Sequence, residues 1–391
     1  MNALKKGILD LLKACIKEEK IQLPADFDWG QACRVGKEHQ ILSMLYYGAL
    51  NAELALPEAV QTKLESVTFQ CIFIDQNQLY EIGQLREKFR ENGIEFVLLK
   101  GTLLKHLYPR TEVRLMSDAD VLIKTEQYDR IRPIMKEMGY TEVLESDHEL
   151  VWDKPGALHL ELHKRLIPSY NKDYYAYFGD GWRLARKTET SEYVMGNEDQ
   201  FIYLFTHYAK HYRDGGIGIR HLVDLYVFLR AYPDLDMAYV ERELESLQLL
   251  TFCKNSLETV RFWFGEGEET PMAAFMTDKI FGSGAYGTEK DHVLSEGVKT
   301  AKEADRESVR RRKLWGLIFP SAKALSQKYP VLKKAPILLP LVWVYRWIVT
   351  LLFRRRTIRH QRERVELLTA ENLSGYQDEL NYVGLDFNFQ E

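Results

Sequence analysis

The spacing of apolar residues in the first part of the chain is that of α-helices. One stripe of apolar side chains recurs at helical intervals near the N-terminus: Leu4, Ile8, Leu11, Leu12 and Cys15. A longer periodic run extends from Pro57 to Arg90 without an internal proline, and it predicts one long helix because proline interrupts helical hydrogen bonding. Residues 1–85 are therefore expected to form an N-terminal helical region.

The pattern changes after Asn92-Gly93, a dipeptide typical of turns. Short apolar runs and alternating runs then predict strands at 94–99, 118–123, 140–144, 149–152 and 158–163. One helix is expected directly after the first strand and another after the second. This order indicates an α+β fold class, with a mixed sheet and helices on one side. We expect this α/β core to span residues 86–165.

Helical spacing returns after residue 166. The clearest helices are 200–212 and 220–231, which Asp214-Gly215-Gly216 separates. Residues 265–290 are rich in Gly, Glu and Thr and are expected to form a loop or linker. The sequence thus predicts a helical domain at 166–290, followed at 291–391 by a helical tail that is both basic and apolar.

Length, net charge and cysteine spacing limit the classes of protein to which the chain can belong. Its 391 residues exceed a typical domain of about 100–200 residues. A net charge of −4 gives no overall sign of a nucleic-acid-binding protein, so nucleic acid is not an expected partner. The four cysteines are far apart and form no CxxC pair, which argues against a disulfide framework. The N-terminal segment lacks the long apolar stretch of a signal peptide, so a cytoplasmic location is expected.

Acidic residues mark two of the predicted strands. Asp118 and Asp120 are two residues apart at the start of one strand, so their side chains point to the same face. Glu161 lies in a strictly alternating strand, LHLELH, on the face that it shares with His159 and His163. If the two strands are neighbours, three carboxylates converge. Such a cluster needs positive charge between its members, and a hard divalent cation with oxygen ligands supplies it.

The turn after the first strand is the second candidate feature. Lys100, Gly101 and Thr102 lie between that strand and the start of a helix. Glycine allows close approach of the backbone to a phosphate, and a helix N-terminus offers N–H groups. Lys100 would add a charge and Thr102 a hydroxyl. Arg114 and Ser117, just before Asp118, are further candidates for contact with a nucleotide phosphate.

These motifs resemble a known family. The order of an apolar strand, a Gly-containing turn, Asp-x-Asp and a third acid resembles that of the DNA polymerase β-like nucleotidyltransferase superfamily. More narrowly, FVLLKGTLL, YPRTEVRLMSDADVLI, LHLELHKRL and IRHLVDLYVF look like the bacterial family of uncharacterised nucleotidyltransferases. The resemblance implies a polymerase β-like core, metal ligands at Asp118, Asp120 and Glu161, and a triphosphate at Gly101-Thr102. Thr102 replaces the usual Ser or Gly, and the interval to Asp118 is longer than the common form.

The tail contains a second distinctive pattern. Residues 337–353 are nearly all apolar but are interrupted by Pro340 and Arg346. This stretch is at the short limit of a membrane span, about 17–25 residues, and a central arginine is costly there. Aromatic and basic residues accompany it: Trp343, Tyr345, Trp347, Lys333-Lys334 and Arg354–Arg356. Three interpretations remain open: a helix that packs on the protein or on an oligomeric partner, peripheral membrane contact through 331–364, or a span.

The expected activity is transfer of a nucleoside monophosphate from an NTP to an acceptor, with release of pyrophosphate. Asp118, Asp120 and Glu161 would be catalytic and would hold two Mg²⁺ ions, for which Mn²⁺ could substitute. The acceptor could be a small molecule, a polysaccharide or a protein. Two alternatives come from other classes: a nucleotide-binding regulatory module without turnover, and a peripheral membrane assembly protein.

Overall fold

The computed structural model describes residues 1–300, 306–326, 328–353 and 355–386. Contacts between residues divide the chain into two compact units. Residues 1–210 and 217–285 form the first unit, and residues 211–216 and 286–386 form the second. The expected helical region, α/β core and helical domain fall almost entirely within the first unit, and the expected tail falls within the second.

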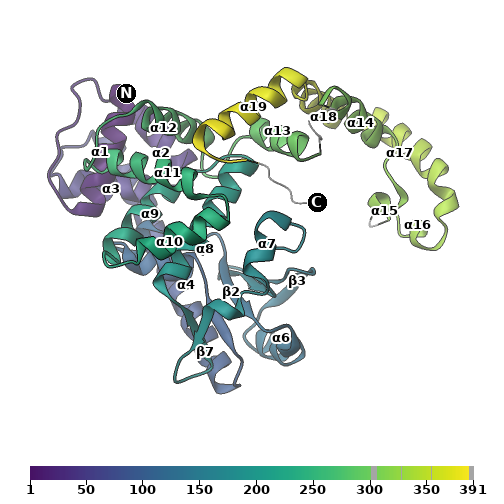
Figure 1. The fold of residues 1–391 in the computed structure, drawn as a ribbon, viewed down its shortest axis with the longest axis horizontal. Helices are drawn as coiled ribbons and strands as arrows, with labels where there is room; N and C mark the ends of the chain where they lie inside the picture. The colour runs from purple at the N-terminus through teal and green to yellow at the C-terminus, as the bar shows by residue number, and fades with distance from the viewer. Residues whose placement is uncertain (301–305, 327, 354, 387–391) are drawn as a thin grey trace. The chain divides into compact units, whose positions relative to one another are not determined.

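Four helices open the first unit (Figure 1). They are α1 (Ala3–Lys17), α2 (Trp29–Glu38), α3 (Leu42–Asn51) and α4 (Glu58–Glu91). The Asn2 side chain caps α1 by accepting a hydrogen bond from the backbone N–H of Lys5 at 2.9 Å. From the predicted apolar stripe, Ile8, Leu11 and Leu12 are fully buried, and α4 is the predicted long helix. These four helices account for most of residues 1–85.

A mixed sheet follows. Its strands are β1 (Phe96–Leu98), β2 (Ala119–Ile123), β3 (Thr141–Glu145), β4 (Glu149–Asp153), β5 (His159–His163), β6 (Ala185–Lys187) and β7 (Glu192–Met195). Within the described residues the order across the sheet is β3-β4-β5-β2-β1-β7-β6. The β2–β5 and β1–β7 pairs are parallel and the others are antiparallel. The predicted α+β class with a mixed sheet is confirmed.

One face of this sheet is apolar and covered by helices. Ile82, Leu85 and Phe89 of α4, together with residues of α6 (Tyr128–Glu137), pack on that face. The strand side chains that they contact include Val121 and Leu160. Alternation along β2 and β5 therefore directs the intervening residues to the opposite face. This is the face that carries the acidic residues.

Further helices complete the first unit. They are α5 (Gly101–Leu104), α7 (Lys172–Phe178), α8 (Asn197–Asp214), α9 (Arg220–Ala231), α10 (Met237–Ser246), α11 (Leu250–Trp263) and α12 (Pro271–Ser283). The last residues of α8, from 211 onward, belong to the second unit. Short 3₁₀ turns lie at η1 (Lys105–Leu107), η2 (Thr111–Val113), η3 (Thr125–Gln127) and η4 (Trp182–Leu184). Helices α8 and α9 are the two that the sequence predicts most clearly.

Two expectations for this region are wrong. Residues 166–265 are not entirely helical, because β6 and β7 extend the sheet beyond β1. These strands are short, and the pairing of β7 with β1 is a long-range contact that local spacing does not reveal. The expected loop at 265–290 contains α12. Thr270 caps this helix, Pro271 occupies its first turn, and Ala273, Met276 and Ile280 form its buried face.

The second unit is helical among its described residues. Its helices are α13 (Glu289–Thr300), α14 (Arg306–Ile318), α15 (Ala322–Leu325), α16 (Val331–Lys334), α17 (Leu339–Phe353), α18 (Arg355–Leu367) and α19 (Ala370–Val383), with a 3₁₀ turn at η6 (Pro336–Leu338). No helix in the described part of the chain is both long and apolar enough to cross a bilayer. Of the basic run at 354–356, Arg354 lies outside the described residues.

Candidate active site

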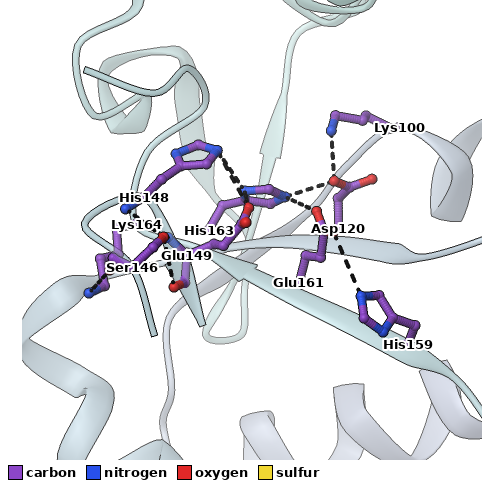
Figure 2. A network of polar contacts seen from close by, with 9 residues as sticks. All are labelled: Lys100, Asp120, Ser146, His148, Glu149, His159, Glu161, His163 and Lys164. Carbon is purple, nitrogen blue, oxygen red and sulfur yellow. Dashed lines mark hydrogen bonds and ion pairs between the residues drawn. The ribbon is translucent and has the colours of Figure 1, made fainter. Parts of the chain in front are cut away.

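The acidic residues come together where β2 and β5 pair. The two strands are parallel, and Asp120 lies directly opposite Glu161 in their register. His163, two residues after Glu161, lies on the same face, and Figure 2 shows its ring directed at the Asp120 carboxylate. Asp118 immediately precedes β2, which begins at Ala119. The sheet thus joins two acids that are separated by 40 residues of chain.

Asp120 is the centre of this cluster. Its Oδ1 atom accepts a hydrogen bond from Lys100 Nζ at 2.7 Å and lies 2.7 Å from His163 Nε2. The Asp120 side chain is only 5% exposed. Burial by itself would raise the pKa of Asp120, but the charges and hydrogen bonds of Lys100 and His163 outweigh it and lower the pKa. Asp120 is therefore ionised at neutral pH and electrostatically paired.

Lys100 reaches this carboxylate from an unusual backbone conformation. It follows β1 at a φ of 48° and a ψ of −115°, a region that residues other than glycine rarely adopt. Burial would lower the pKa of Lys100, but the charge of Asp120 outweighs it and raises the pKa. The lysine is therefore a fixed positive charge. Backbone strain next to a buried ion pair makes this turn a candidate functional position.

The pKa of Glu161 is raised, whereas that of Asp120 is lowered. Burial raises its pKa first, and the negative charge of Asp120 raises it further, while His163 lowers it. Asp118 also raises the pKa of Glu161, so its charge acts on the same cluster. Glu161 therefore disfavours its ionised form unless positive charge is added nearby.

Two groups of side chains could hold a metal ion among the described residues. One consists of Asp120, Glu161 and His163, and the other of His148, Glu149 and His163. In each group the ligand atoms lie within 4.8 Å of one another, and His163 belongs to both. Burial, followed by the charge of His163, lowers the pKa of His148 to about 3. His148 is therefore neutral at pH 7 and has the protonation state of a metal ligand.

His148 and Glu149 are candidate site residues that the sequence pattern did not single out. In the antiparallel pair of β4 and β5, Glu149 lies opposite His163, and its Oε2 is 3.4 Å from His163 Nδ1. His148 Nε2 is 3.2 Å from the same Nδ1 atom. The only local signal was a charged residue at the start of a strand whose middle is apolar, ELVWD.

The turn after β1 is tightly packed against its surroundings. Thr102 is buried, and its hydroxyl donates to the carbonyl of Leu99 at 2.6 Å. A Cβ atom at Gly101 would lie 2.8 Å from Met116 Cγ and 3.4 Å from Arg114 Nη1. Glycine at this position thus allows the segment before β2 to pack against the turn.

Arg114 is held by another part of the first unit. Its Nε and Nη2 atoms donate to the two carboxylate oxygens of Asp224 in α9, at 2.8 and 3.0 Å. Tyr108 Oη donates to the same carboxylate at 2.7 Å. Burial would raise the pKa of Asp224, but Arg114 outweighs it and lowers the pKa. The arginine therefore anchors the segment that leads to Ser117, which is exposed, and to Asp118.

A second buried network ties this segment to α4. Lys105 Nζ lies 2.6 Å from Asp75 Oδ1, and both side chains are completely buried. Thr111 donates its hydroxyl to Asp75 at 2.6 Å, and Gln78 donates to the carbonyl of Met116 at 2.7 Å. Because buried polar networks of this kind resist rearrangement, the long interval between the turn and β2 is rigidly supported.

A mixed sheet that pairs Asp120 with Glu161, beside a strand–turn–helix unit with a lysine, is the arrangement expected of a nucleotidyltransferase core. A family model described as "uncharacterised nucleotidyltransferase" matches residues 25–265. The match covers more than half of the chain, and the protein therefore belongs to this nucleotidyltransferase family. Neither a curated protein nor a solved structure gives a match.

Proposed function

We propose that the protein transfers a nucleoside monophosphate from an NTP to an acceptor oxygen. The observation that carries the proposal is the register of Asp120 opposite Glu161, with Asp118 close enough to raise the pKa of Glu161. In the balanced step, the acceptor oxygen forms a bond to the α-phosphorus. The bond between that phosphorus and the oxygen bridging to the β-phosphate breaks, and pyrophosphate leaves with the electron pair.

The donor set fits a hard divalent cation. Asp120 and Glu161 offer carboxylate oxygens, which Mg²⁺ prefers, and His163 adds a nitrogen that Mn²⁺ also accepts. Burial and then the charge of Asp120 raise the pKa of Glu161, so a cation bound nearby would favour the ionised carboxylate. Asp118, Asp120 and Glu161 would hold the ions. When bound, such ions neutralise phosphate charge and make the acceptor oxygen more acidic.

The chain's own residues then have distinct tasks. Lys100 Nζ lies 2.7 Å from Asp120 Oδ1, and Lys100 would bind a phosphate oxygen of the NTP. Ser117 is exposed beside Asp118 and would be a second phosphate contact. Glu161, with its raised pKa, is suited to accept the proton that the acceptor hydroxyl loses.

Three residues near the turn have a structural role in this proposal and no side-chain contact with phosphate. They are Gly101, Thr102 and Arg114. The Thr102 hydroxyl donates a hydrogen bond to the Leu99 carbonyl, and the Arg114 guanidinium donates to the Asp224 carboxylate. We propose that these residues fix the turn and the segment before Asp118, so that Lys100 and the carboxylates keep their geometry. Gly101 would let backbone groups of the turn approach the triphosphate.

The test is calorimetric binding of ATP, GTP, CTP and UTP with and without Mg²⁺. Wild type is expected to bind at least one NTP only with Mg²⁺, and Asp118→Asn and Asp120→Asn are expected to lose that binding. Asp129→Asn is the matched control, because Asp129 is 99% exposed on α6, and α6 packs on the opposite face of the sheet from the cluster. Equal Mg²⁺-dependent binding by wild type and Asp120→Asn would refute the proposal.

A nucleotide-binding module without turnover is the second candidate. It is favoured by one observation: Lys100 and His163 already supply Asp120 Oδ1 with positive and hydrogen-bonding partners. The two candidates differ in a measurable product. An enzyme releases pyrophosphate from a bound NTP once an acceptor from cell extract is added, whereas the regulatory module binds the NTP and releases none.

A further inference from the structure

The second unit contains a long segment with charge of one sign. Residues 308–350 contain nine Lys and Arg residues, and residues 351–362 contain five more. Neither stretch contains an Asp or a Glu, in a chain whose net charge is −4. A segment of this kind is attracted to a polyanionic surface. Lys328, Lys333 and Lys334 are exposed among its described side chains.

The same segment exposes large apolar side chains. In α17, Leu341 is 67% exposed and Ile348 is 52% exposed, and Val344 and Tyr345 between them are about half exposed. Their spacing of three, four and seven residues places them on one face of the helix. Ile337, just before α17, is 87% exposed. This outward face of α17 is therefore a continuous apolar strip.

The opposite side of α17 has a structural role. Trp343 Nε1 donates to the carbonyl of Pro320 at 2.9 Å, and Arg346 Nη1 donates to that of Leu317 at 2.8 Å. Trp347 Nε1 donates to Ile318, which ends α14. These bonds hold α17 against α14 and direct the apolar strip outward. The strip is thus a consequence of packing within the second unit.

A groove of about 760 Å³ lies beside this strip. Apolar side chains of α14 and α17 line it, including Leu314 and Trp347. Four basic residues also line it, Arg310, Lys328, Arg346 and Arg362, together with Glu366, which pairs with Arg362 at 2.7 Å. Its volume is within the range of small-molecule sites, about 300–1,000 Å³. An apolar lining with basic groups matches an amphiphile with an acyl chain and a phosphate.

We propose that helices α14 to α18 bind the surface of a bilayer that contains anionic phospholipid. The outward face of α17 enters the acyl-chain boundary, and the surrounding Lys and Arg residues contact lipid phosphates. A nucleic acid could contact the basic residues, but it would not bury the apolar strip, which would stay exposed to water. A second copy of the segment would bring like charges together, which disfavours self-association through it. The inference is independent of the proposed transfer reaction.

The experiment is co-sedimentation of the full chain with vesicles of phosphatidylcholine, with and without phosphatidylglycerol. Binding is expected only to vesicles that contain phosphatidylglycerol, and it should weaken as salt screens the basic residues. The double variant Leu341→Asp/Ile348→Asp removes the apolar strip and is expected to weaken binding by about tenfold or more. Lys333→Gln/Lys334→Gln should weaken it by about thirtyfold.

Phe69→Asp/Phe73→Asp is the matched control. Phe69 is 72% and Phe73 is 76% exposed on α4, so the double change adds the same charge at two exposed apolar positions outside the second unit, and vesicle binding is expected to be unchanged. Circular dichroism of each variant checks that the helices are retained. The proposal is overturned if the chain binds neither vesicle, binds both equally, or binds as well after Leu341→Asp/Ile348→Asp. Binding to a nucleic-acid duplex but not to vesicles would also overturn it.

Discussion

Lys100 and Asp120 form an ion pair of 2.7 Å between the turn that follows β1 and the middle of the acidic face. Both side chains are largely buried, and His163 contacts the same carboxylate oxygen. The pair couples the candidate phosphate-binding turn to the candidate metal ligands. A change at either residue should therefore affect both folding and ligand binding.

Removal of Lys100 alone should destabilise the protein. Lys100→Met leaves a buried carboxylate with His163 as its main partner, and we expect the free energy of unfolding to fall by about 3 kcal/mol. Urea denaturation measures the change. The double variant Lys100→Met/Asp120→Leu should recover most of the loss, because it removes both buried charges. A single-variant loss below about 0.5 kcal/mol would show that the pair behaves as a solvated surface pair.

Glu161→Gln should stabilise the metal-free protein at neutral pH. Burial and the charge of Asp120 raise the pKa of Glu161 in the folded state, so its ionisation opposes folding above the unfolded-state pKa of about 4.3. The advantage of the glutamine variant should be greatest above the folded-state pKa and should vanish as pH falls below about 4.3. Thermal unfolding between acidic and neutral pH, in the presence of EDTA, measures this.

Mg²⁺ provides the control for that prediction. If Glu161 is a ligand, Mg²⁺ should raise the melting temperature of wild type more than that of Glu161→Gln, because only the folded wild type carries the full ligand set. A glutamine variant that is less stable than wild type at pH 7 without metal would contradict the electrostatic argument.

Gly101→Ala should destabilise the turn. The added Cβ would lie 2.8 Å from the Cγ atom of Met116, which is buried in the core beneath the sheet. Met116 is flexible, so the expected loss is about 1–2 kcal/mol, measured by chemical denaturation. Mg²⁺-dependent NTP binding should weaken in parallel, because the turn and the segment before Asp118 move apart.

Gly83→Ala is the matched control for the glycine change. Gly83 lies within α4, and a Cβ there would meet no atom within 4 Å. Alanine has the higher helix propensity, so this variant should be more stable by about 0.5–1 kcal/mol. If Gly101→Ala were also stabilising, close packing at the turn would not be the reason for its glycine.

Arg114→Gln should destabilise the protein by leaving Asp224 buried without its bidentate partner. The expected loss in the free energy of unfolding is about 3 kcal/mol, and Asp224→Asn should lose a similar amount. Lys20→Ala serves as the control, because Lys20 and Glu53 form a pair with both side chains more than 70% exposed; no measurable change is expected there. Equal effects of Arg114→Gln and Lys20→Ala would exclude an anchoring role for Arg114.

Local spacing determined much of the fold before any contact was known. The alternation in LHLELH and DADVLI assigned Glu161 and Asp120 to one face and Leu160 and Val121 to the other, and the core on the α4 side confirms it. This is possible because side-chain direction in a strand depends only on residue parity. The long helix α4 and the stripe of α1 follow from periodicity in the same way.

Only the tertiary structure decided which residues meet across the sheet. The pairing of β2 with β5, the position of β7 beside β1, and the approach of His148 and Glu149 to His163 are contacts between distant segments. Lys100 likewise meets Asp120 only because a strained turn directs it there. The sequence determined the face on which each group lies, because that property is local. Long-range packing decided the partner of each charge, because burying an ionised group without an opposite charge nearby costs free energy.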